Sequence, residues 1–318
     1  MPTSVSQALC SLAGGKAPPT DVSVAYGLFG ACALTVYHFV ANGEFSAVLT
    51  MAVMLQCLAI SLLCLQTLAN GSATGLSARA LGMEAASLAL RLSSTTWLNG
   101  YLPVDASGDL VYQLVDACSL AMVLWLLRQV AVVHRGSYQA PRSRGPPPRG
   151  WAAPWRRAAA DAKGKRGRGH AEADADTLPV GHMLLGAFAL AALLHADMNS
   201  RPVFDTLWMA GLFVGVVSVL PQLWLVSKTG GVVQACTSHW IAMMAASRVM
   251  SGIFMWHARF DVTCSPWVEG FSHAIWAILA AHLVHLVLLG DFAYCYLKAI
   301  ATQGLACNLD LRAELDIV

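Results

Sequence analysis

The chain has 318 residues, of which 57% are hydrophobic and only 12% charged, with a formal net charge of +2. This composition excludes a soluble domain with a single core and indicates a helical protein that crosses a membrane several times. The nine cysteines are scattered, with no CxxC pair and no zinc spacing, so we predict neither a disulfide framework nor a metal site. No P-loop, dinucleotide fingerprint or Ser-His-Asp spacing is present, so we expect neither an enzyme nor a cofactor.

In chain order, residues 1–21 are predicted to be a cytosolic tail without a cleaved signal peptide. Eight apolar spans follow, and each is long enough to cross a bilayer or nearly so. They lie at about 22–42, 45–66, 78–98, 110–133, 179–196, 203–226, 236–258 and 269–299. Residues 301–318 are predicted to be a second cytosolic tail.

Between the fourth and fifth spans, residues 135–178 form a loop rich in proline, glycine and arginine. Eleven of the twenty lysines and arginines lie between Arg128 and His170. Without an apolar face, such a segment is predicted to be disordered. Because lysine and arginine favour the cytosolic side, this loop and both chain termini are expected in the cytosol. We interpret it as a solvated linker; a patch for anionic lipid or nucleic acid is the alternative.

The stretch Leu220–Gly231, LPQLWLVSKTGG, has a specific pattern. Pro221 removes one backbone hydrogen bond and should bend its helix, and the amide of Gln222 can satisfy a freed carbonyl. Lys228 lies in the polar turn that ends the helix. The simpler interpretation is an ordinary proline-kinked membrane helix.

A weak internal repeat accompanies this stretch. A glutamine, a polar turn and a helix with an arginine occur both at Gln66 to Arg91 and at Gln222 to Arg248. This predicts an all-α bundle with two parallel three-helix repeats, 44–134 and 203–300, joined by a linker helix in 179–202. The span in 22–43 is then an extra N-terminal helix. Such a SWEET-like, PQ-loop arrangement encloses a central cavity.

Charged residues within apolar spans are costly and usually face the interior of a bundle, where they bind ligands or pair. Here they are Glu84, Arg91, Asp116, Arg248 and Asp291. The two arginines, one from each repeat, predict a site for an anion such as a carboxylate. The alternative is purely structural pairing of Glu84 with Arg91 and of Asp291 with Arg248.

Several histidines lie in or beside the spans. His282 and His285 share a helix face, but a metal site has no third ligand in the sequence pattern. His239 follows the start of the seventh span. We interpret all three as interior or interfacial histidines, with a proton sensor as the alternative.

The block LPQLWLVSKTGG, then TSHW at Thr237–Trp240, then Arg248 resembles the KDEL receptors, the ER lumen protein-retaining receptor family. Further resemblances are Gly75-Leu76-Ser77 before the helix with Arg91, and the stretch Gly290–Tyr296. The resemblance extends over roughly residues 48–300 without the basic loop. The extra first helix is similar to that of the plant-type receptor-like branch.

This resemblance implies a receptor that binds C-terminal retention signals in the Golgi and returns ER luminal proteins in retrograde vesicles. It implies acid-favoured binding, with Arg91, Arg248 and Asp291 as binding residues. The remaining buried charges and the histidine near the start of the seventh span, Glu84, Asp116 and His239, are secondary candidates. Vesicle-coat or lipid contacts on the cytosolic side are implied partners, and nucleic acid is not. The sequence departs from the family pattern at Leu49, Gln56, Ser94, Gly215 and Ser247.

Two other functions use the same features. A bundle of this type could transport a small solute such as an amino acid or a sugar. A scaffold could recruit cytosolic partners or anionic lipid through the basic loop. A receptor-like relative that has lost peptide binding is a further alternative.

Overall fold

A computed structural model describes residues 20–40, 45, 47–71, 73, 75–96, 109–133, 176, 178–196, 202–229, 232–233, 235–260, 271–303 and 309–310. Side chains are described for these residues except 20–22, 40, 109, 227–229, 232–233, 235–238, 291–292, 295–303 and 309–310. Of the predicted basic loop, this leaves Asp176 and Leu178 and no more.

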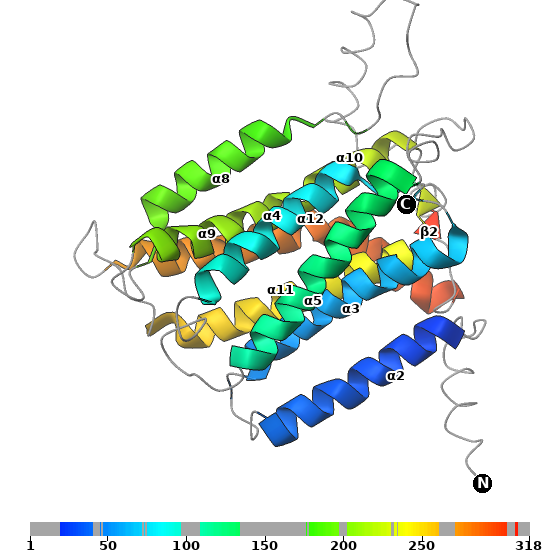
Figure 1. Ribbon diagram of the computed structural model, residues 1–318, viewed down its shortest axis with the longest axis horizontal. Helices are drawn as coiled ribbons and strands as arrows, with labels where there is room; N and C mark the ends of the chain where they lie inside the picture. Colours follow the sequence, from blue (N-terminus) through cyan, green and yellow to red (C-terminus); the bar gives the residue numbers. More distant parts are fainter. Residues whose placement is uncertain are drawn as a thin grey trace, which may run out of the picture.

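The described chain is almost wholly helical, and each of the eight expected spans contains a helix (Figure 1). The first half comprises α2 (Thr20–Thr35) with the π-helical turn η1 (Val36–Val40), α3 (Ala47–Asn70), α4 (Ala78–Thr95), and α5 (Asp109–Arg128) with η2 (Gln129–Val133). The second half comprises α8 (Val180–Leu194), α9 (Pro202–Val217), α10 (Val219–Thr229), α11 (Ala235–His257) with the 3-10 turn η3 (Ala258–Phe260), and α12 (His273–Gln303). The expected all-α fold is therefore confirmed.

One short element was not predicted from the sequence. Two-residue strands β1 (Val232–Val233) and β2 (Leu309–Asp310) pair antiparallel, with Val232 opposite Asp310. They join the segment after α10 to the segment after α12.

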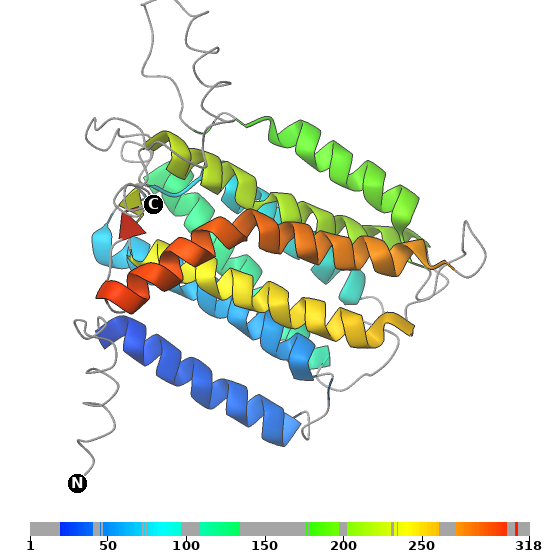
Figure 2. The same ribbon diagram turned by 180° about the vertical axis from the view of Figure 1, so that it is seen from behind.

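Helices from the two halves of the chain interleave. α3 packs along α11, α4 packs along α9, and α5 and α12 pack against α4 and α11, respectively. α2 and α8 lie on opposite flanks of the bundle, beside α3 and α9 (Figures 1 and 2). The crossed pairs α3–α11 and α4–α9 are the contacts that two related triplets would make. The repeat itself stays a prediction.

The surface of this bundle suits lipid. Large apolar side chains are exposed on several helices, among them Leu28, Leu124, Leu193 and Val287. In the part of the chain that the structure describes, α3, α5 with η2, α9 with α10, and α12 contain segments long and apolar enough to cross a membrane. The chain is thus a polytopic helical membrane protein. α4 is less apolar because it carries polar groups that point into the bundle.

Candidate functional site

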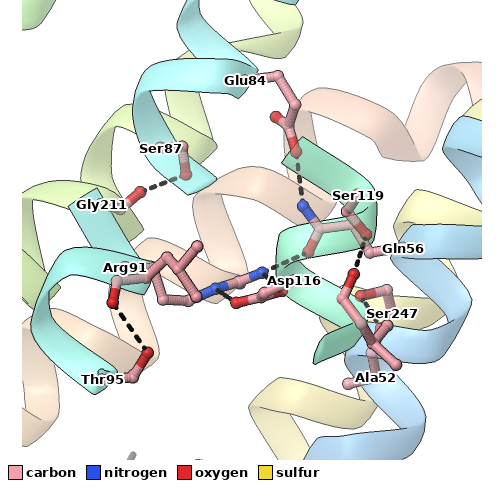
Figure 3. Close-up of polar contacts among 12 residues, drawn as sticks. Ala52, Gln56, Glu84, Ser87, Arg91, Thr95, Asp116, Ser119, Gly211 and Ser247 are labelled. Carbon is pink, nitrogen blue, oxygen red and sulfur yellow. Dashed lines mark hydrogen bonds and ion pairs between the residues drawn. The ribbon is translucent and has the colours of Figure 1, made fainter. Parts of the chain in front are cut away.

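A bidentate ion pair lies between α4 and α5. The Nε and Nη2 atoms of Arg91 donate to the two carboxylate oxygens of Asp116 over 2.6 and 2.5 Å (Figure 3). The Asp116 side chain is fully buried, and that of Arg91 is 14% exposed. This geometry is the strongest that a guanidinium offers, so the charges of both groups are compensated by one another.

The pair continues into a chain of buried polar groups. Arg91 Nη2 also donates to Gln56 on α3 at 3.2 Å, and Gln56 Nε2 donates to Glu84 at 2.6 Å (Figure 3). The other oxygen of Glu84 accepts from Ser218, between α9 and α10, at 2.8 Å. The alternative expectation that Glu84 pairs directly with Arg91 is therefore wrong. Glu84 and Arg91 are seven residues apart on one helix. They are linked through Gln56, because Nε and Nη2 of Arg91 donate to Asp116.

α4 and α9 approach closely at the GxxxG sequence Gly211–Gly215. A Cβ on Gly211 would lie 3.1 Å from Ser87 O and 3.2 Å from Arg91 N, both backbone atoms of α4. Ser87 donates across the contact to Gly211 O at 2.7 Å (Figure 3). The two glycines thus allow close packing of α4 against α9.

Arg248 of α11 enters the space that these glycines leave. A Cβ on Gly215 would lie 3.5 Å from Arg248 Nη2. Arg248 is 4% exposed, and its Nε and Nη2 have no hydrogen-bond partner within the described residues. The two arginines of the sequence pattern therefore differ: Arg91 is paired, and Arg248 presents buried donors that have no acceptor among the described residues.

Both arginines line one hollow. It lies at the end of the bundle where α3, α5 and α9 begin and α11 ends, because Leu49, Tyr112, Trp208 and Met255 also line it. Its wall is apolar apart from the two arginines and a few polar groups: Ser87, Tyr112, Ser251 and His282. An anion that enters would meet Arg248 in a largely desolvated setting.

The proline-glutamine motif lies toward the opposite end. The helix breaks at Ser218, between α9 and α10, because Pro221 has no N–H for the carbonyl of Val217. Gln222 accepts from Ser77 N and donates to Gly75 O, each over 2.8 Å. Its amide thus satisfies backbone groups of the segment between α3 and α4, not a carbonyl freed in its own helix.

The remaining candidates are placed as follows. His239 is 1% exposed on α11, and its Nδ1 lies 3.1 Å from the hydroxyl of Tyr26 on the extra helix α2. Asp291 lies on α12 and Lys228 on α10, and their side chains lie outside the described part. His239 thus joins α2 to the bundle, away from the lining of the hollow.

His282 and His285 lie one turn apart on α12 and are buried, at 5% and 1% exposed. Their four ring nitrogens have no hydrogen-bond partner among the described residues. Within those residues no group of three metal-ligating side chains occurs. Both histidines are therefore interior residues, as expected, but within the described part of the chain they lack the hydrogen bonds that buried ring nitrogens normally make.

The positions where the sequence departs from the family pattern have contacts of their own. Ser94 donates to Phe204 O at 2.9 Å, and Ser247 donates to Ala52 O at 2.6 Å. Leu49 lines the hollow, Gly215 admits Arg248, and Gln56 links Arg91 to Glu84. These residues fix helices to one another or shape the hollow.

The anchor at the end of the basic loop was not predicted from the sequence. Asp176, 1% exposed, accepts from Ser77 Oγ at 2.7 Å and from Arg79 N at 3.1 Å, and Arg79 donates to Leu178 O. Ser77 is the N-cap of α4 and accepts from Ala80 N at 3.0 Å. The signal for this anchor was weak, since one aspartate at the edge of a polar loop is common.

Buried charges inside an apolar helical bundle, with one arginine that makes no ion pair among the described side chains, define a polytopic membrane protein with a charged internal hollow. A family model described as ER lumen protein retaining receptor matches residues 165–259, which include α8 to α11 and Arg248. The resemblance seen in the sequence is thereby confirmed for this segment.

The curated proteins that this chain resembles carry the same description as the family model. ER lumen protein-retaining receptor erd-2.2 of Caenorhabditis elegans is 28% identical over 127 residues, 40% of this chain and 54% of the relative. ER lumen protein-retaining receptor 2 of Xenopus laevis and that of Danio rerio are each 28% identical over 125 residues, 39% of this chain and 53% of the relative. The match thus spans about half the length of these relatives.

Proposed function

We propose that this chain is a KDEL-receptor-like membrane receptor, which binds C-terminal retention signals and returns ER luminal proteins from the Golgi. The observation that carries the proposal is Arg248: a buried guanidinium with two donors that have no partner among the described residues, inside a hollow, within the segment that resembles the receptors. A peptide C-terminus supplies the carboxylate that such a group binds.

The proposed orientation places the hollow where such a ligand arrives. With the basic loop and both termini in the cytosol, the starts of α3, α5 and α9 face the lumen of the ER and Golgi. The residues that line the hollow lie at that end of the bundle. Retention signals are luminal, so ligand and hollow meet on the same side.

Among the proposed binding residues, Arg248 takes the carboxylate directly. Arg91, held by Asp116, contributes to the wall of the hollow, and its positive charge is balanced there. Asp291 is proposed from the resemblance to take the basic side chain of the signal. Vesicle-coat or lipid contacts belong to the cytosolic face.

The test is retrieval in cells in which this chain is the sole receptor of its kind. A luminal reporter that ends in a retention signal should stay inside the cell with the native chain and be secreted with Arg248→Met. Arg259→Met is the matched control, because Arg259 stacks on Trp256 and Phe260 outside the hollow. Retention of the reporter by Arg248→Met would reject the proposal. If Arg248→Met leaves retrieval unchanged but abolishes a solute flux that the native protein shows in proteoliposomes, the chain is a transporter.

A further inference from the structure

His282 faces the same hollow as Arg248. It lies on α12, is 5% exposed, and lines the hollow together with Arg248. Neither of its ring nitrogens has a hydrogen-bond partner within the described residues. A buried imidazole of this kind leaves at least one N–H donor unused, whichever tautomer is present.

Gly252 sets the position of this ring relative to Arg248. The two residues are four apart on α11 and therefore lie on one face of the helix, one turn apart. A Cβ on Gly252 would lie 3.6 Å from His282 Cβ and 3.9 Å from His282 Cγ. The imidazole thus packs against the face of α11 that carries Arg248.

The Arg91–Asp116 pair shows how a carboxylate can bind a guanidinium in this bundle. Arg91 uses Nε and Nη2 to hold both oxygens of Asp116. In Arg248 the same two nitrogens, Nε and Nη2, are buried donors that have no partner in the described part of the chain. A carboxylate bound to Arg248 would therefore accept hydrogen bonds from Nε and Nη2, as Asp116 does from Arg91.

The neighbouring acids are already engaged. Asp116 is held by Arg91, and Glu84 accepts from Gln56 and Ser218. Asp291 lies nine residues beyond His282, about 13 Å along the helix axis. Arg248 makes no ion pair among the side chains that the structure describes. A buried cation in this state attracts an external anion.

We propose that Arg248 and His282 together bind one carboxylate group: Arg248 through Nε and Nη2, and His282 through one ring N–H. The inference rests on the proposed function in so far as the carboxylate is that of a peptide C-terminus. His282 is then a ligand-binding residue that this chain adds on α12, and it makes the site selective for a free terminal carboxylate over an amide.

His285 provides a matched control. It lies one turn further along α12, is 1% exposed, and likewise has no hydrogen-bond partner among the described residues. It lines a different hollow, together with residues such as Trp240 and Leu289. The two histidines therefore differ chiefly in which hollow they face.

The experiment measures the affinity of the full-length protein in lipid nanodiscs for a fluorescent peptide that ends in HDEL with a free carboxylate. His282→Phe should weaken binding about tenfold or more, since it removes a charge-assisted hydrogen bond. His285→Phe should change it less than about twofold. The thermal midpoint of His282→Phe should be unchanged or higher, because an unpartnered polar group is replaced by an apolar ring. If His282→Phe does not fold, His282→Ala gives the same comparison.

The outcomes separate the two proposals. Native affinity in His282→Phe would overturn the inference and leave the retrieval function intact. Failure of the native protein to bind the peptide would reject the retrieval function, and acetate then becomes the probe. Thermal stabilisation by acetate that is lost in both Arg248→Met and His282→Phe would support the carboxylate site. If acetate does not stabilise the native protein, the proposed carboxylate site is rejected as well.

Discussion

Arg91 of α4 and Asp116 of α5 form a buried bidentate ion pair, with donor–acceptor distances of 2.6 and 2.5 Å. Asp116→Ala should leave Arg91 buried without its counter-charge and lower the free energy of unfolding by about 3–5 kcal/mol. Arg91→Met together with Asp116→Leu should cost much less, because neither charge then remains buried alone. Denaturant unfolding of the single and double variants measures this difference. Equal losses in Asp116→Ala and in the double variant would show that the pair is not coupled.

Gln222 is expected to fix the position of α10 relative to the start of α4. Gln222→Leu leaves Ser77 N and Gly75 O without their partner and should cost about 2–4 kcal/mol. Gln113→Leu is the matched control, because the Gln113 amide donates one bond, to Thr95 O at 3.0 Å, in a partly buried position; we expect a loss of about 1 kcal/mol. Hydrogen exchange at residues 75–80 should rise in the first variant and stay unchanged in the second. Protection of those amides in Gln222→Leu would contradict the assignment.

The close approach of α4 and α9 depends on two glycines. Gly211→Ala places a methyl group 3.1 Å from backbone, and Gly215→Ala places one 2.9 Å from Ser87 Oγ. We expect each to lower the free energy of unfolding by about 1–3 kcal/mol. Gly186→Ala on α8 meets nothing within 4 Å and should be neutral or stabilising by about 0.5–1 kcal/mol. Gly215→Ala should also weaken ligand binding, because the methyl group would lie 3.5 Å from Arg248 Nη2. Similar stability of all three variants would argue against close packing at this contact.

The basic loop is expected to be dispensable for ligand binding. Asp176 and Leu178 hold its end to Ser77 and Arg79 at the start of α4, outside residues 140–170. A chain with 140–170 replaced by a short Gly-Ser linker should therefore fold and bind the HDEL peptide with native affinity. Loss of activity in cells with native peptide affinity would favour a scaffold role for the loop. Loss of peptide affinity would show that the loop contributes to the site.

The positions of the helices could be predicted from the sequence, because an apolar run of bilayer length admits few other structures. The partners of the buried charges could not. Glu84 and Arg91 share a helix face, but Arg91 pairs with Asp116 on the next helix, and only the packing of α4 against α5 decides between the two acids.

Arg91 and Arg248 also occupy equivalent places in the sequence pattern, but their contacts in the folded bundle differ. Arg91 is bonded to Asp116, whereas Arg248 lies against Gly215 of α9 and shares its hollow with His282 of α12. His282 could not be singled out from the sequence, since a histidine in an apolar helix is usually bonded within the core. Its position opposite Gly252 depends on how α11 and α12 meet.

The central claim is that Arg248 binds the terminal carboxylate of a retention signal. The most direct test compares a peptide ending in HDEL as the free acid with the same peptide amidated, at about pH 5.5 and about pH 7.4, on the purified full-length protein. We expect saturable binding of the free acid at the lower pH, and loss of that binding on amidation or in Arg248→Met but not in Arg259→Met. Equal affinity for the acid and the amide, or no binding at either pH, would contradict the claim.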